Sequence, residues 1–167
     1  MKVTSTHTYA APPDDVVTMM TDPDVLTATY EALVHRDIRI VDHEVDDDGA
    51  ITVVSKRSVP MDVPGFAKRF LSPMNTVEQR DEWSAPADDG SRDGTWHVNA
   101  SGVPVDVGGT QRITPGEKPG PTEVRVDGEV RSSVPIVGGK LAGFVGGDLE
   151  RTIAAEEDFT DAHLAAR

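Results

Sequence analysis

Apolar and polar residues alternate along most of this chain, and a period of two predicts β-strands. The clearest example spans residues 123–132, where Val124, Val126 and Val130 share one face and charged residues occupy the other. The same pattern predicts six more strands, at residues 2–10, on both sides of a turn within 35–60, and at 76–84, 95–100 and 105–113. Strands with one charged and one apolar face are typical of an antiparallel sheet covered on one side.

The last thirty residues change to a helical period. An apolar stripe at four-residue steps predicts one long helix after Pro135, and the stripe comprises Leu141, Val145, Leu149 and Ile153. Three glycines interrupt it, at roughly 1 kcal/mol each relative to Ala: Gly143, Gly146 and Gly147. They either let the helix approach a strand backbone or kink it to leave a void beside its first half. Beyond Ala154 the sequence is polar, so this end is expected to project into solvent.

Shorter helices are predicted in two other places. Pro13 and Pro23 each stand at a helix start beside acidic residues, which favour the positive end of a helix. The segment 64–71 carries Phe66 and Phe70 at helical spacing between two strands. Its apolar side is expected to lean on the sheet as a lid or a mobile mouth.

Composition narrows the possible partners. The chain has 167 residues and a formal charge of -13. Because phosphate binding depends on clustered Lys and Arg, this charge argues against nucleic acid as a partner. No cysteine is present, so disulfides and thiolate chemistry are excluded. No apolar run is long enough to insert in a membrane. We expect one domain over residues 1–167, in the cytoplasm.

Metal and nucleophile signals are weak. The loop 44–49 places acids as a calcium loop would, but Ser55 stands where the bidentate Glu is needed. His35, Asp37 and His43 are spaced too widely for zinc, and their parity predicts polar residues on the outer face. No Gly-x-Ser-x-Gly turn or phosphate-binding loop occurs. We therefore expect no metal and no cofactor.

The order of a strand, two short helices, six strands and a long helix resembles the START-like (SRPBCC) helix-grip superfamily. Three stretches resemble an actinobacterial domain-of-unknown-function branch (DUF2505-like): Val-Pro-Gly-Phe-Ala-Lys-Arg-Phe at 63–70, Gly-Thr-Gln-Arg-Ile-Thr-Pro at 109–115 and Val-Pro-Ile-Val-Gly-Gly-Lys-Leu at 134–141. The resemblance implies an α+β fold in which a curved seven-stranded antiparallel sheet wraps the C-terminal helix around a cavity. Superfamily members carry lipids, bind plant hormones, cyclise polyketides or act as co-chaperones.

Strand parity places several polar side chains among the inward apolar ones, and buried polar groups need a hydrogen-bond partner in the protein or in a ligand. The expected cavity residues are Leu26, Tyr30, Phe66, Phe70, Gln79, Asp81, Trp96, Val98, Gln111, Phe144 and Asp148. The favoured hypothesis is non-enzymatic binding of a hydrophobic or amphipathic small molecule or lipid. The alternatives are a cyclase- or hydrolase-like enzyme using the same cavity, and a protein-interaction module.

Overall fold

The computed structural model describes residues 1–117 and 120–167 and contains seven strands and three α-helices in that range. The elements are β1 (Lys2–Tyr9), α1 (Pro13–Thr21), α2 (Pro23–Ala32), β2 (Arg36–Val45), β3 (Ile51–Pro60), the 3-10 turn η1 (Gly65–Ala67), β4 (Met74–Trp83), β5 (Arg92–Ala100), β6 (Asp106–Pro115), β7 (Thr122–Arg131) and α3 (Gly138–Ala165). The predicted α+β class and the order of elements are confirmed.

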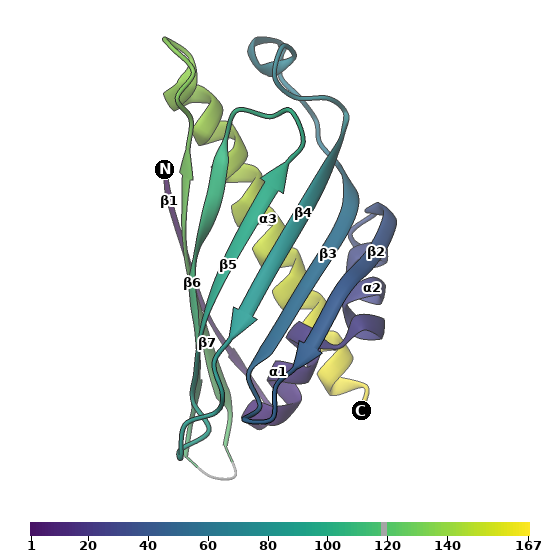
Figure 1. Cartoon of the computed structure of the whole chain (residues 1–167), viewed down its shortest axis with the longest axis vertical. Coiled ribbons are helices and arrows are strands. Elements are labelled where there is room, and N and C mark those ends of the chain that lie inside the picture. The colour runs from purple at the N-terminus through teal and green to yellow at the C-terminus, as the bar shows by residue number, and fades with distance from the viewer. Residues whose placement is uncertain (118–119) are drawn as a thin grey trace.

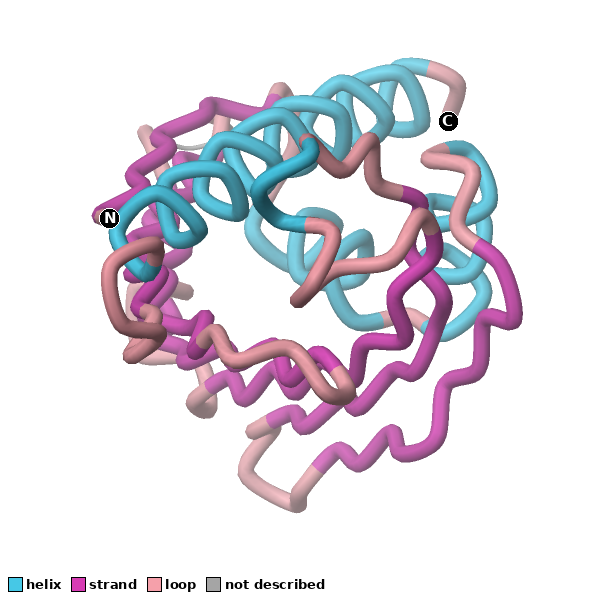
Figure 2. Tube along the Cα trace, turned by 90° about the horizontal axis from the view of Figure 1, so that it is seen from above, coloured by secondary structure: helices cyan, strands magenta, loops and turns pink. Residues whose placement is uncertain are grey.

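The strands form one antiparallel sheet in the order β1-β7-β6-β5-β4-β3-β2. β1 reaches across the chain to pair with β7, so the first and last strands are neighbours. The sheet curves strongly, and Figure 2 shows the strands following an arc that the helices close on the other side. α3 runs diagonally across the concave face in Figure 1. This arrangement leaves room between sheet and helix.

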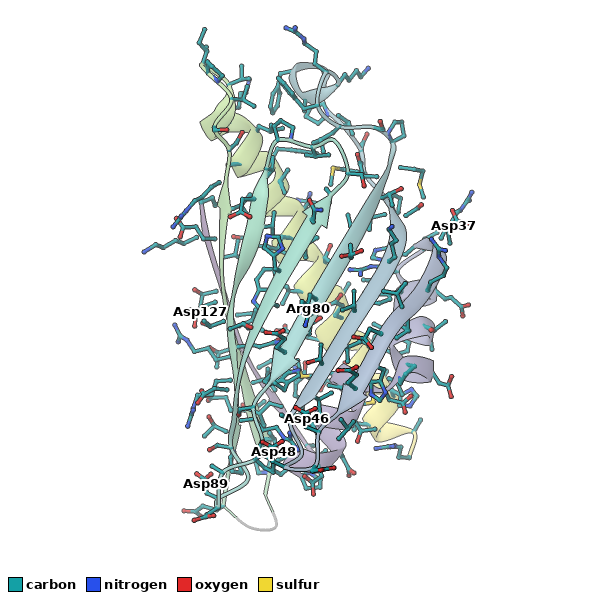
Figure 3. The ribbon with its side chains drawn as sticks, viewed as in Figure 1. Asp37, Asp46, Asp48, Arg80, Asp89 and Asp127 are labelled. Atoms are coloured by element: carbon teal, nitrogen blue, oxygen red, sulfur yellow. The ribbon has the colours of Figure 1, made fainter. Side chains whose placement is uncertain are left out.

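The convex face carries the charged half of the alternating pattern, as the labelled Arg80 and Asp127 illustrate in Figure 3. Side chains two positions apart on this face form ion pairs along a strand, for example Arg80 with Glu82 and Arg125 with Asp127. All of these side chains are exposed, and exposed ion pairs contribute little to stability. Their main effect is to keep this face in water and direct the apolar face inward.

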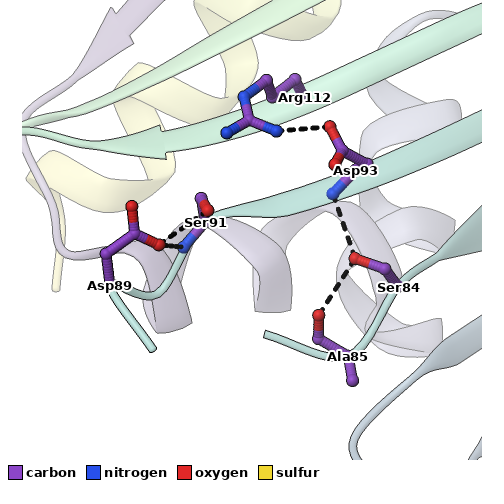
Figure 4. Close-up of polar contacts among 6 residues, drawn as sticks. All are labelled: Ser84, Ala85, Asp89, Ser91, Asp93 and Arg112. Carbon is purple, nitrogen blue, oxygen red and sulfur yellow. Dashed lines mark hydrogen bonds and ion pairs between the residues drawn. The ribbon is translucent and has the colours of Figure 1, made fainter. Parts of the chain in front are cut away.

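Hydrogen bonds also close the connection between β4 and β5 (Figure 4). The Asp89 carboxylate accepts from the backbone N–H and the hydroxyl of Ser91, at 2.9 and 2.7 Å. The Ser84 hydroxyl donates to the Ala85 carbonyl and accepts from the Asp93 backbone N–H, at 3.0 and 3.1 Å. These local bonds fix the turn and so the register of two strands that carry inward polar side chains.

α1 and α2 form the corner after β1. Pro occupies the first position of each helix, and the Asp22 carboxylate caps α2 by accepting from the N–H groups of Asp24 and Val25, both at 3.0 Å. Val16 and Val17 pack into a core with Tyr9, Trp83 and Ile113, among others. The two helices therefore cover the end of the sheet.

α3 is continuous over 28 residues and begins three residues after Pro135. Of its glycines, Gly146 is buried against the side chain of Met1, whereas a Cβ on Gly143 would meet nothing within 4 Å. The close approach of Met1 therefore explains the glycine at 146, whereas no neighbouring atom requires a glycine at 143.

The prediction that α3 projects into solvent beyond Ala154 is wrong. The Ser5 hydroxyl donates to the Glu157 carboxylate, and His7 Nε2 lies 2.8 Å from Asp161 Oδ2. Thr160 is buried, and Leu164 packs against the core near Tyr9. The polar residues of this half face the middle of β1, where Ser5 and His7 point inward, and that pairing was not visible from either segment alone.

The segment between β3 and β4 contains one turn of 3-10 helix, Gly65–Ala67, inside the predicted short helical segment 64–71. Its apolar side packs on the start of α3, with Ala67 and Leu71 buried against Leu141. The Phe66 and Phe144 rings meet edge to face at 6.4 Å. This is a small second core at the end of the molecule where α3 begins.

Candidate functional site

A cavity of about 210 Å³ lies between the concave face of the sheet and α3. Its wall is mostly apolar, and α2, β3 to β7 and the middle of α3 all contribute to it. Representative apolar residues are Leu26, Trp96, Val98, Val126, Val145 and Leu149. An apolar cavity with a few convergent polar groups is the usual form of a small-molecule site.

Eight of the eleven residues expected from the sequence line this cavity: Leu26, Tyr30, Gln79, Asp81, Trp96, Val98, Gln111 and Asp148. The other three lie elsewhere. Phe66, Phe70 and Phe144 belong to the small core beside η1, because that turn packs on the start of α3 rather than over the sheet. The part of α3 that faces the cavity is its middle and second half, from Val145 to Thr160.

Sequence reasoning missed the group at the centre of the site, Arg57. This side chain is buried, and each of its three nitrogens donates a hydrogen bond. The acceptors are His35 Nδ1 at 3.1 Å, Ser55 Oγ at 2.9 Å and Gln79 Oε1 at 2.8 Å. The guanidinium carbon also lies 3.8 Å from the centre of the Tyr30 ring. Arg57 has the parity of Ile51 and Val53 on β3, which was the available signal.

His35 was expected on the outer face, and that expectation is wrong. Val34 adopts a positive φ of 64° before β2, and the His35 backbone N–H donates to the Tyr30 carbonyl at 3.0 Å. This turn swings the imidazole inward, where it stacks on Tyr30 with ring centres 5.6 Å apart. Burial, and then Arg57, lower the pKa of His35 to about 4. The ring is therefore neutral at pH 7 and accepts the Arg57 bond.

The hydrogen-bond chain continues from Arg57 through Gln79 to Asp81. Gln79 Nε2 donates to Asp81 Oδ2 at 3.0 Å, and Gln111 Nε2 donates to Asp81 Oδ1 at 3.2 Å. Burial raises the pKa of Asp81 to about 6, although both amide bonds and Arg57 oppose the rise. Asp81 and Gln111 thus have protein partners, and the chain joins side chains of β3, β4 and β6.

Glu156 is the second group that sequence reasoning missed. It lies on the half of α3 that had been expected to face solvent, and it lines the cavity. Burial raises the pKa of its carboxyl group to about 7, Arg57 opposes the rise, and Asp81 and Glu157 add to it. Asp148 lines the same wall, and burial raises its pKa as well. Acidic groups therefore gather along one side of a largely apolar space.

Both tryptophans form part of the wall, and the indole N–H groups of Trp83 and Trp96 have no hydrogen-bond partner among the described residues. Trp96 lies against Gly128, where an added Cβ would collide with its ring. The glycine therefore makes space for the indole in the wall.

A second, more open pocket adjoins the cavity. The two share His35, Val59, Asp148 and Thr152. The second is also bounded by Ala32 at the end of α2, by Leu33 directly after it, and by Arg151 and Phe159 of α3. This places an opening between the end of α2 and α3. Of the segment 64–71, which was expected to form a lid or a mouth, Leu71 lines the inner cavity.

The acidic turn between β2 and β3 is a hairpin tip. Asp46 and Asp48 lie together at the end of the hairpin in Figure 3, and Asp48 Oδ1 accepts from the Ala50 backbone N–H at 3.0 Å. Across residues 1–117 and 120–167, no three His, Asp or Glu side chains are grouped to hold a metal ion. In the same residues, no helix is both long enough and apolar enough to cross a membrane.

The curved seven-stranded antiparallel sheet around one long C-terminal helix defines the class of fold, the START-like helix-grip fold. A START superfamily protein from Mycobacterium smegmatis has the same fold, with a TM-score of 0.56 and 17% identity over 96% of this chain and 97% of the other. The norcoclaurine synthase of Thalictrum flavum, in a structure with dopamine and hydroxybenzaldehyde, gives a TM-score of 0.56 and 16% identity over 100% and 87%.

Within that class the chain belongs to the family described as "Protein of unknown function (DUF2505)", whose pattern matches residues 4–164. An uncharacterised protein of Mycobacterium tuberculosis is 25% identical over 115 residues. The matched segment covers 68% of this chain and 66% of that relative, slightly under two thirds of its length. The resemblance inferred from three short stretches is confirmed.

Proposed function

We propose that this protein binds a hydrophobic or amphipathic small molecule, such as a lipid, between the concave face of the sheet and α3. The observation that carries the proposal is the 210 Å³ cavity, with apolar walls and a chain of polar groups that includes Arg57, Gln79 and Asp81. Close packing is the rule in protein interiors, so a void of this size lowers stability unless something occupies it. We propose that residues 1–167 act as one domain in this role.

The adjoining pocket supports exchange of the ligand. Its residues belong to the end of α2, the end of β3 and the exposed side of α3, so a small displacement of α2 from α3 widens the path. The fold gives independent support of a general kind, since the norcoclaurine synthase structure holds two small aromatic molecules. Fold alone does not specify the ligand.

The quickest test is to extract purified protein with organic solvent and to record a native mass spectrum of the intact protein. The mass of any extracted molecule is then compared with the extra mass carried by the intact protein. We expect a co-purified small molecule, released on denaturation. Trp83 and Trp96 are the only two tryptophans in the sequence, and both line the cavity. Occupancy should therefore change the intrinsic fluorescence.

A cavity-filling pair of variants provides the control. Leu149→Trp and Val126→Phe each add volume inside the wall and should abolish ligand retention while preserving the fold, checked by circular dichroism. Two independent variants guard against one that misfolds. Protein that is empty in every preparation and shows no fluorescence response to any apolar probe would refute the proposed function.

An enzyme using the same cavity is the second candidate. The observation in its favour is that Asp81 and Glu156 have pKa values of about 6 and 7, which suits proton transfer near neutral pH. Once a ligand is identified, Asp81→Asn should abolish its conversion without loss of binding. A ligand recovered chemically unchanged after prolonged incubation supports the binding function instead.

A further inference from the structure

The carboxyl group of Glu156 stands apart from the other acids of the cavity wall. Four acidic residues line the cavity, and three of them have a polar partner in the protein. Asp81 accepts from two glutamines, Asp148 Oδ1 lies 3.5 Å from Arg151 Nη2, and Glu157 accepts from Ser5. Within the described residues, Glu156 has neither a hydrogen bond nor an ion pair, and only more distant charges act on it.

Glu156 also points toward the ligand space. It follows Thr152 and Ile153 by one helical turn, and all three line the cavity, so the carboxyl group lies on the face of α3 that looks at the sheet. An ionised carboxylate without a partner in such a place is costly, and a bound cation or hydroxyl would remove much of that cost. A charge-assisted hydrogen bond is the strongest contact available to it.

The single buried cation of the cavity is already engaged by the protein through three of its five N–H donors. Among the described lining residues Arg57 is the only Lys or Arg, and each of its nitrogens already donates to the protein. One face of its guanidinium is covered by Tyr30. An anionic head group would therefore meet four acids and an engaged arginine, whereas a cationic one would meet a free carboxyl group.

We infer that the ligand of this cavity carries a basic nitrogen on a hydrophobic body, and that Glu156 accepts a hydrogen bond from its protonated amine. The inference rests on the proposed function and names the class of molecule: an amphipathic amine. Its tail would lie along the apolar wall near Val126, Val145 and Leu149. Asp81 and Arg57 hold the deeper polar chain in place and do not contact the amine.

The groups that face Glu156 come from several elements and favour this assignment. Arg57 on β3 lowers the pKa of Glu156, while Asp81 on β4 and Glu157 on α3 raise it, and burial has the largest effect. The acids outnumber the arginine, so the field in the cavity attracts positive charge. His35, the remaining titratable neighbour at the opening, is neutral at pH 7 and adds no competing charge.

The test compares octylamine, octanol and octanoate, which share one apolar tail and differ in the charge of the head group. Protein stripped of co-purified ligand is titrated with each, and binding is followed by tryptophan fluorescence and by calorimetry. We expect octylamine to bind at least tenfold more tightly than the other two, a difference of about 1.4 kcal/mol. Glu156→Gln should remove that preference, so that the variant binds octylamine no more tightly than octanol.

Glu150→Gln is the matched control, since it makes the same chemical change at an exposed position of the same helix outside the cavity. Equal affinity for all three probes, or tighter binding of octanoate, would overturn the inference while leaving the proposed function intact. A preference for octylamine that survives Glu156→Gln would also overturn it. Failure of every probe, together with empty purified protein, would instead count against the proposed function itself.

Discussion

Glu156→Gln should stabilise the ligand-free protein at about pH 8 and leave its stability at about pH 4 nearly unchanged. Gln has almost the shape of Glu and no charge, so the substitution removes the buried carboxylate and little else. The pKa of Glu156 is raised from 4.5 to about 7, mainly by burial. The folded protein therefore binds this proton more tightly than the unfolded chain does.

This difference in proton binding sets the direction in which stability changes with pH. For a carboxyl group with a raised pKa in the folded state, its favourable contribution is present below the unfolded pKa of 4.5 and is lost as pH rises to about 7. One pKa unit corresponds to about 1.36 kcal/mol, so the shift has an upper value of about 3 kcal/mol. Water that reaches the cavity screens part of the charge, and we expect roughly 1–3 kcal/mol in the free energy of unfolding.

The assay is thermal and urea denaturation of wild type and variant at both pH values. For a chain of this size, 1 kcal/mol moves Tm by roughly 2–4 °C, so the variant should melt roughly 2–12 °C higher at pH 8. Glu150→Gln should change stability by less than about 0.5 kcal/mol at either pH. An equal effect of Glu156→Gln at both pH values, or none at pH 8, would show that ionisation of this group carries no such cost.

Four other substitutions probe the cavity and the rest of the fold. Arg57→Met leaves two buried acceptors and one half-buried acceptor without their donor and should cost about 3–5 kcal/mol in urea denaturation, whereas wild-type stability would contradict the hydrogen-bond chain. Gly143→Ala should stabilise by roughly 0.5–1 kcal/mol, since an added Cβ meets nothing and helix propensity improves. Gly109→Ala should destabilise by about 1–3 kcal/mol or more, because its Cβ would collide with a neighbouring strand's carbonyl; thermal melts of the two glycine variants should move in opposite directions. Asp93→Ala breaks only an exposed pair with Arg112 and should shift the free energy of unfolding by less than about 1 kcal/mol, so a larger loss would contradict its surface role.

Much of the fold was determined by local pattern. Alternation along 123–132 reports directly that one face of a strand is wet and the other buried, and Pro13, Asp22 and Pro23 mark helix starts through their own backbone chemistry. Five cavity residues followed from the same parity, because side chains two positions apart on a strand share a direction. They are Gln79, Asp81, Trp96, Val98 and Gln111.

What the sequence left open depended on contacts between distant segments. The polar half of α3 resembles a solvated helix until β1 is placed beside it, where Ser5 and His7 meet its carboxylates. Phe66 and Phe70 are apolar whichever core they join, and only the path of η1 assigns them to the small core.

The polar centre of the cavity is the clearest example of a feature that only the tertiary structure determines. Arginine and histidine are usually exposed. Parity placed His35 on the outer face, and Arg57 was not among the expected cavity residues. Their burial is tolerated because each satisfies the other, with Tyr30, Ser55 and Gln79 completing the shell. The sequence by itself determined a half-covered sheet and a long helix. Only the tertiary structure decided which polar groups the two enclose, since a hydrogen bond between residues far apart in the chain leaves no periodic trace.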